Sequence, residues 1–256
     1  MTKGKCTLIV LLACWHNLHA QPGKIDTDRP DQTESAVVLP KNYFQVEIGF
    51  NKESTYGKDY DLIHPTLLMK YGLKKIELRL EATYKSSYEQ LIPDPKWTTG
   101  LEPLHLGFRM ALWEEKKLLP KTSLLVHLGI PALGSKVFKP DHLIPSFRFS
   151  MQHSIADGIA LGYNVGAEWD GFTSTPAWIY TLAPGFDLGE KWYGYFEVFG
   201  SVINGGPPQH NFDAGIAYYI SNDVKIDISG GVGISKAAPK NYLAIGGSFR
   251  FNSKTK

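Results

Sequence analysis

Cysteine is almost absent from the chain, and its placement excludes several kinds of site. Cys6 and Cys14 are the only two cysteines among 256 residues, and both lie within the first twenty. If that segment is removed on export, the rest has no disulfide framework, no thiolate nucleophile and no cysteine-ligated zinc. Histidine does not take over this role, because the eight histidines show no paired ligand spacing. We therefore expect no metal ion and no cofactor.

Long apolar runs and an excess of charge are also lacking. No stretch approaches the roughly 18 apolar residues that a transmembrane helix needs. The formal net charge is +2, and Lys3 and Lys5 near the start account for all of it. A chain without a basic excess offers no electrostatic case for binding nucleic acid.

The first segment, residues 1–20, resembles a secretory signal peptide. Lys3 and Lys5 form its positive end, residues 7–13 form a short apolar core, and Ala20 is a small residue at the end. Residues 11–14 (LLAC) loosely resemble a lipobox, so lipoprotein processing is the alternative. Because Trp15 and His16 would be an unusual start for a lipoprotein, we favour cleavage after Ala20.

A polar, non-periodic segment follows at residues 21–42. Its centre carries the motif residues Asp26, Asp28, Arg29, Pro30, Asp31 and Glu34. Four carboxylates near one arginine are compatible with a bound cation, or with a solvated or lumen-plugging strap. The motif shows no ligand spacing that would define a cation cage. We therefore predict a periplasmic or plugging strap and no metal site.

Residues 73–84 show the pattern that the rest of the chain repeats. Apolar side chains such as Ile76 and Leu78 share one parity, and charged side chains such as Glu77 and Arg79 share the other. A period of two is that of a β-strand with one apolar and one polar face. Twelve such segments follow one another up to residue 251. The weakest is 61–71, where Pro65 cannot donate to a ladder, so we expect a bulge or a late start there.

The connections between these segments decide between a soluble sandwich and a membrane barrel. Tight turns at 72–74, 156–158, 189–190 and 221–223 alternate with longer links at 51–60, 85–99, 131–143, 171–176, 203–210 and 233–241. Residues 114–121 form one longer link on the tight-turn side. Short turns at one rim and long loops at the other are typical of outer-membrane barrels. We predict an all-β fold, a 12-stranded antiparallel transmembrane β-barrel over residues 43–251, with a polar tail at 252–256.

In such a barrel the apolar parity meets lipid and the polar parity lines the lumen. The residues predicted to line the lumen are Glu47, Lys75, Glu77, Arg79, Glu81, Arg109, Arg148, Glu168, Asp187, Glu197, Asp213, Lys225, Asp227 and Arg250. Two roles remain open for them. They pair across the interior and hold a narrow barrel shut, or they form a passage of mixed charge for small solutes.

Residues 27–35 (TDRPDQTES) and 40–47 (PKNYFQVE) resemble the start of a bacterial family. It is the outer-membrane transporter-like family named for the meta-cleavage pathway of phenol degradation. The resemblance is sharp over residues 26–50 and general beyond them. It implies an outer-membrane barrel that passes hydrophobic or aromatic compounds, and it supplies no catalytic residues. Residues 246–251 (GGSFRF) resemble the terminal signal read by the barrel-assembly machinery, although five residues follow them.

A lipid-modifying enzyme would need a histidine and a hydroxyl nucleophile on one face of a strand. His153 and Ser154 are adjacent and point to opposite faces, whereas His64 and Thr66 have the spacing but no evident carboxylate to orient them. We predict a non-enzymatic, passive outer-membrane pore for small molecules. The alternatives are a non-conducting structural or adhesive barrel and a lipid-modifying barrel enzyme. The expected partners are outer-membrane lipid, lipopolysaccharide, the barrel-assembly machinery and the solute.

Overall fold

Antiparallel sheet makes up most of the protein. The computed structural model describes residues 23–55, 57–90 and 93–254, so the predicted export signal lies outside the described residues. The strands are β1 (Tyr43–Ser54), β2 (Tyr60–Gly72), β3 (Ile76–Glu89), β4 (Lys96–Leu101), β5 (Leu104–Trp113), β6 (Lys121–Ile130), β7 (Ile144–Ala156), β8 (Ile159–Glu168), β9 (Ala177–Leu188), β10 (Trp192–Ile203), β11 (Gln209–Ser221), β12 (Val224–Gly233) and β13 (Asn241–Asn252).

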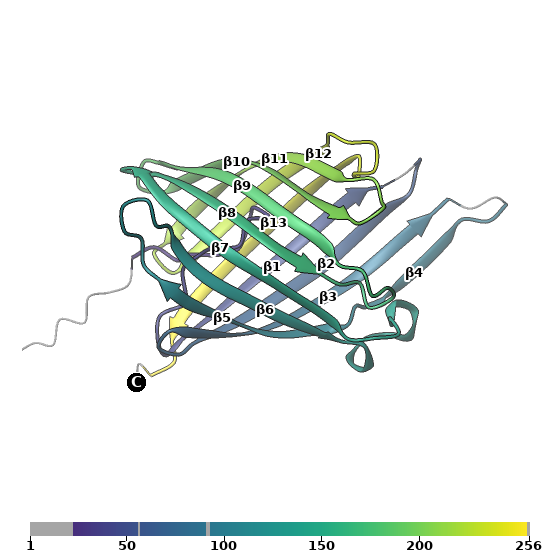
Figure 1. The fold of residues 1–256 in the computed structure, drawn as a ribbon, viewed down its shortest axis with the longest axis horizontal. Helices are drawn as coiled ribbons and strands as arrows, with labels where there is room; N and C mark the ends of the chain where they lie inside the picture. The colour runs from purple at the N-terminus through teal and green to yellow at the C-terminus, as the bar shows by residue number, and fades with distance from the viewer. Residues whose placement is uncertain (1–22, 56, 91–92, 255–256) are drawn as a thin grey trace, which may run out of the picture.

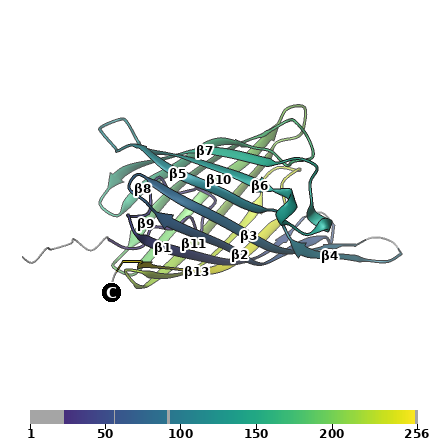
Figure 2. The same ribbon diagram turned by 90° about the horizontal axis from the view of Figure 1, so that it is seen from below.

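The sheet closes on itself as a barrel (Figures 1 and 2). Most strands pair with their neighbours along the chain, and β1 pairs with β13 from Tyr43 opposite Asn252 to Ser54 opposite Asn241. Each pairing is antiparallel. Closure leaves no long unpaired edge, which is the condition for crossing a bilayer with strands.

β4 and β5 together occupy one strand position. β5 pairs with the first half of β3, and β4 pairs with its second half, from Tyr84 opposite Leu101 to Glu89 opposite Lys96. Glu102 and Pro103 separate the two pieces, and Pro103 has no N–H to donate. The barrel therefore has twelve strand positions, which confirms the predicted number.

The expected link at residues 85–99 was largely wrong, because β3 and β4 continue through it as a hairpin. This hairpin extends beyond the rim of the barrel (Figures 1 and 2). It lacks apolar and polar alternation at its tip, so the sequence pattern gave no sign of strand. The defect expected in β2 is present: its register against β3 shifts between Ile63 and Thr66, across Pro65.

The two rims differ as predicted from loop length. The tight-turn rim carries the connections 73–75, 114–120, 157–158, 189–191 and 222–223, together with the start of β1 and the end of β13. The long-loop rim carries the other connections, including two short helical turns, η1 (Pro131–Leu133) and η2 (Lys136–Phe138). In outer-membrane barrels the short turns face the periplasm.

The outer wall of the barrel is apolar and the interior is polar. Large outward-facing side chains are exposed on strand after strand, among them Phe50, Leu78, Phe196, Ile216, Ile226 and Phe249. Buried positions are dominated by charged and polar side chains. This inversion of a soluble fold is what hydrocarbon outside and a polar lumen inside require. Among the described residues, no helix is long and apolar enough to span a membrane.

Candidate functional site

The segment before β1 folds into the barrel and returns to the rim from which it enters. We call residues 23–42 the strap. At one end, the Ile25 amide donates to the Asn222 carbonyl in a tight turn over 2.7 Å, and at the other the Asn42 amide donates to the Gly72 carbonyl over 2.8 Å. Both ends therefore lie at the tight-turn rim, and the middle of the strap lies in the lumen.

An ion cluster fixes the strap to one side of the lumen. The Asp28 carboxylate contacts three cationic side chains, Lys70 on β2, Arg79 on β3 and Arg109 on β5. Its oxygens lie 2.8 Å from Arg79 and 2.6 Å from Arg109. Glu34 of the strap adds a second contact to Arg109, at 2.5 Å. Together with Glu47 and Glu77 of the wall, these side chains form what we call the Asp28 cluster.

The charge on Asp28 is stabilised by this surrounding. Burial alone would raise its pKa, but the cations Arg109, Lys70 and Arg79 outweigh burial and hold the pKa well below its usual range. The carboxylate therefore stays ionised over the physiological pH range, and the cluster persists with it.

Wall carboxylates also hold the backbone of the strap. Glu47 on β1 accepts hydrogen bonds from the Asp28 and Arg29 amides at 3.1 and 3.2 Å. Glu77 on β3 accepts from the Leu39 amide at 2.9 Å. These bonds satisfy buried N–H groups that have no ladder partner in a non-periodic segment. The lumen charges thus serve as anchors for the chain itself.

The far end of the strap contacts the opposite wall. The Gln32 amide donates to Glu197 on β10 over 2.7 Å, and the Thr33 hydroxyl donates to the same carboxylate over 2.5 Å. The Glu34 amide donates to the Asn164 side chain on β8 over 2.7 Å, and the amide of that side chain returns a bond to the Glu34 carbonyl. The strap therefore bridges the lumen from the β2, β3 and β5 side to the β8 and β10 side.

A pair of glycines makes room for the strap arginine. Gly49 on β1 lies directly opposite Gly246 on β13, and a Cβ atom at either position would overlap the Arg29 guanidinium. With both side chains absent, Arg29 lies against the wall and forms an ion pair with Asp227 at 2.8 Å.

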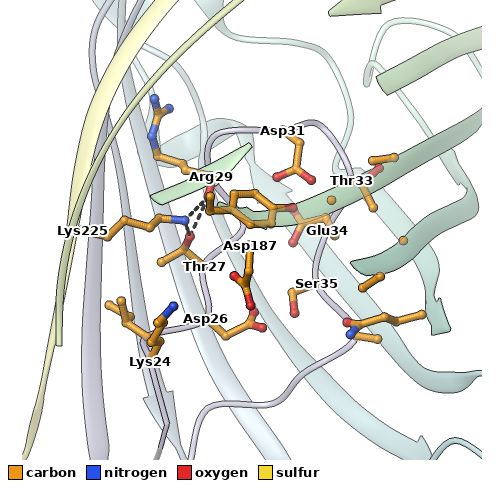
Figure 3. Close-up of a pocket in the computed structure, with 18 of the residues that line it drawn as sticks. Lys24, Asp26, Thr27, Arg29, Asp31, Thr33, Glu34, Ser35, Asp187 and Lys225 are labelled. Carbon is orange, nitrogen blue, oxygen red and sulfur yellow. Dashed lines mark hydrogen bonds between the residues drawn. The ribbon is translucent and has the colours of Figure 1, made fainter. Parts of the chain in front are cut away.

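Beside the strap lies a cavity of about 280 Å³ near the tight-turn rim (Figure 3). The strap forms one side of it, and residues of β7 to β12 form the other. Its lining includes Asp26 and Asp31 of the strap, Asp187 on β9, and the rings of Tyr193 and Tyr219. The strap therefore occupies part of the lumen and leaves part of it open.

The structure places most of the predicted lumen residues inside the barrel. Those with buried side chains are Glu47, Glu77, Arg79, Arg109, Glu197, Asp213, Lys225, Asp227 and Arg250. Those that are partly exposed are Glu81, Arg148 and Glu168, and Arg148 pairs with Glu168 at 2.5 Å. Lys75 and Asp187 are exposed near the tight-turn rim, where parity no longer determines burial. A role for these residues in solute passage stays a prediction.

Several residues of the site had escaped the sequence patterns. Lys70 is buried in the Asp28 cluster, but it belongs to β2, the weakest of the predicted strands, to which the sequence analysis assigned no inward-facing residues. Asn164 and Thr181 contact the strap as neutral side chains, so a search for charges did not select them. Within the described ranges, no three histidine or carboxylate side chains are arranged so that they could hold a metal ion.

The histidine considered for catalysis has a different partner from the one its spacing suggests. His64 Nε2 lies 2.8 Å from the Ser86 hydroxyl, which in turn lies 2.8 Å from that of Thr99. Within the described part of the chain, no carboxylate forms a hydrogen bond or ion pair with His64. His64 and Ser86 therefore lack the carboxylate that orients the histidine in a catalytic triad.

Solved structures similar to this fold include outer-membrane channels and porins. An outer membrane channel from Pseudomonas putida F1 is 11% identical, with a TM-score of 0.67 over 84% of this chain and 97% of that one. The KdgM porin, solved with disordered oligogalacturonate, is 7% identical, with a TM-score of 0.56 over 81% and 99%. The NanC porin is 12% identical, with a TM-score of 0.50 over 80% and 98%. At such identities the likeness is one of fold, and it agrees with the apolar outer wall in placing the protein in the outer membrane.

No curated protein sequence matches the chain. A protein-family model matches residues 27–251, which include most of the strap and the barrel up to Phe251. Its description is "Putative MetA-pathway of phenol degradation", the family that residues 27–47 resemble. The chain belongs to this family.

Proposed function

We propose that the protein is a passive pore for small molecules whose lumen is narrowed by the strap. One observation carries the proposal: inside a closed, membrane-spanning barrel, the strap shares the polar lumen with a solvent-reachable cavity of about 280 Å³. A structural barrel has no need of such a space, whereas a solute path does.

The strap acts as a plug in this proposal. Its contacts to both walls keep it across the lumen, and its two ends are tied to the tight-turn rim. Solutes pass between the strap and the wall formed by β7 to β12. The strap thus sets the width of the path, and its displacement widens it.

Current recordings in planar bilayers test both parts. We expect wild-type protein to give small single-channel steps, and a variant lacking residues 23–40 to give larger ones. No steps from either protein would reject the pore. Equal steps from both would reject the strap as a plug and leave the pore intact.

A non-conducting structural barrel is the second candidate. The observation in its favour is the Asp28 cluster, which ties together β1, β2, β3 and β5 through the strap as a filled core would do. The same recordings separate the two candidates, since a structural barrel stays silent at every voltage.

The family description directs the choice of solute toward small aromatic compounds, and we extend the proposal to them. The barrel wall further fits outer-membrane lipid and lipopolysaccharide as its surroundings. The outward-facing Phe249 and Phe251 at the end of β13 suit recognition by the barrel-assembly machinery. Liposome swelling with aromatic and non-aromatic solutes of equal size tests the solute class, and no preference would argue against it.

A further inference from the structure

The cavity beside the strap exists because small residues occupy the wall there. Ala160 and Gly162 on β8 and Ala183 and Gly185 on β9 face the cavity. A Cβ at Gly185 would overlap the Tyr193 side chain, so the ring lies over this glycine. The wall is thus hollowed by small side chains and lined by an aromatic ring.

The charged groups of the cavity fall into two sets. The first is engaged elsewhere: Glu34 pairs with Arg79 and Arg109, and Arg29 pairs with Asp227. Lys225 is also engaged, since its ammonium donates to the Thr27 hydroxyl and, over 2.6 Å, to the Arg29 carbonyl (Figure 3).

The second set consists of carboxylates that take no part in these ion pairs. Asp26, Asp31 and Asp187 line the cavity, and within the described ranges none of them forms an ion pair. Figure 3 shows the three side chains around one space, reaching it from the strap and from β9. Asp26 and Asp187 are exposed to solvent, so the space can be reached from the tight-turn rim.

The strap itself places one cation, the ammonium of Lys24, at the edge of the cavity. The Lys24 ammonium lies over the Tyr219 ring, 4.9 Å from its centroid. An aromatic face attracts cations through its quadrupole, and more strongly when water is partly excluded. Because Lys24 and Tyr219 both line the cavity, the tethered ammonium shows which chemistry the lining accepts.

We propose that this cavity binds small organic cations, with the ammonium between the exposed carboxylates of Asp26 and Asp187 and an apolar or aromatic body against Tyr193. The inference rests on the proposed pore, because it assigns a solute class to the path beside the strap. At about 280 Å³ the cavity lies near the lower end of the volumes that ligand pockets show. It therefore suits a small aryl-alkyl amine rather than an oligosaccharide.

Three probes that share one ring and differ in charge test the proposal: phenethylamine, 2-phenylethanol and phenylacetate. Equilibrium dialysis against purified full-length protein in detergent measures binding without requiring conductance. We expect phenethylamine to bind about tenfold more tightly than the neutral alcohol, as one charge-assisted contact provides. Phenylacetate should bind more weakly still. Equal binding of the three probes, or no binding of phenethylamine, would overturn the proposal.

Variants locate the site. Asp187→Asn, a change at an exposed position, should weaken phenethylamine binding about tenfold, and Lys24→Gln should strengthen it because the tethered competitor is gone. Asp26→Asn, also at an exposed position, gives a second loss-of-charge variant should Asp187→Asn fail to fold. Glu190→Gln removes a negative charge from a neighbouring tight turn outside the cavity and is the matched control.

Unchanged binding in the folded cavity variants, or an equal loss in Glu190→Gln, would show that the cavity is not the site. Single-channel recordings without any probe test the pore separately. Binding by a silent barrel would reject the pore and keep the site, whereas conductance without charge discrimination would reject the site and keep the pore.

Discussion

Replacing Asp28 by asparagine removes the charge that ties the strap to three cations of the wall, with little change in side-chain volume. The Asp28 side chain is only 6% exposed, and those of Arg79 and Arg109 are 0% and 1% exposed. Removing one partner from a buried ion pair typically costs about 3–5 kcal/mol. The lower end applies here, because Lys70 keeps Glu47 and both arginines keep Glu77 as partners.

The loss acts on docking of the strap. Asp28 belongs to the strap, whereas the wall cations retain their wall carboxylates when the strap leaves. A loss of about 3 kcal/mol lowers the ratio of docked to undocked strap roughly 100-fold. If the strap narrows the pore, Asp28→Asn should open wide conductance states far more often than the wild type does.

Single-channel recording in planar bilayers measures the open fraction directly. Asp61→Asn is the matched control, because Asp61 also pairs with a lysine, Lys85 at 2.9 Å, but does not contact the strap. We expect the control to behave as the wild type. An Asp28→Asn protein with wild-type openings, alongside a strap deletion that conducts strongly, would refute the assigned role of the cluster. So would an equal effect of Asp61→Asn.

Two further predictions concern the strap. Gly246→Ala should lower the free energy of unfolding in detergent by about 1–3 kcal/mol, because the added methyl group displaces the Arg29 guanidinium and leaves the buried Asp227 carboxylate without its cationic partner. Gly247→Ala, whose added Cβ would lie 3.5 Å from its nearest neighbour, should leave the free energy of unfolding unchanged. Equal effects of the two substitutions would contradict the idea that Gly49 and Gly246 make room for Arg29. Raising the pH should also weaken docking of the strap, because the pKa of the docked Asp31 is raised well above its usual range. Burial is the main cause; Glu197 on β10 and Asp213 on β11 add to it, and Lys225 on β12 opposes it. When the strap is undocked, Asp31 loses its proton near its ordinary pKa of about 3.9, whereas the docked Asp31 keeps it to a higher pH. The free energy of docking therefore falls as the pH rises above about 3.9, and it stops falling once the pH has passed the raised pKa of the docked state. Asp28 has a lowered pKa, so the docking free energy that it contributes is lost only in strong acid. The fraction of time that the channel is open should therefore rise with pH in bilayer recordings. If Asp31→Asn left this dependence of the open fraction on pH unchanged, Asp31 would not be its cause.

Strand periodicity was enough to predict the barrel, because a lipid-facing wall imposes alternation on every strand. Glu77 and Arg79 on β3 show this well: their parity alone placed them inside, and both are buried there. The prediction failed where lipid does not constrain the sequence. The end of β3 and the start of β4 form a hairpin that extends beyond the barrel rim (Figure 1), where lipid imposes no alternation, so residues 85–99 were predicted as a loop.

The site was harder to predict than the fold, for a different reason. Asp28 and Arg109 lie 81 residues apart, and the strap has no period that would indicate its partners. Residues 61–71 were predicted as a strand, but the inward position of Lys70 follows only once the register of β2 is known on the far side of the shift at Pro65. The space for Arg29 could be predicted only by knowing that Gly49 lies opposite Gly246. This register between β1 and β13 is set by closure of the barrel and cannot be read from either segment alone.

The contacts also resolve a conflict between a charged lumen and aromatic cargo. The strong charges concentrate on the β1, β2, β3 and β5 side, where strap and wall neutralise one another in the Asp28 cluster. The cavity lies on the other side of the strap, where small residues and tyrosine rings form much of the wall. If solutes take the proposed path, they meet small residues and tyrosine rings there together with the charged side chains that line the cavity. A count of charges along the inward parity therefore describes mainly how the strap is held, and we expect the composition of the wall beside the cavity to decide which solutes the proposed pore admits.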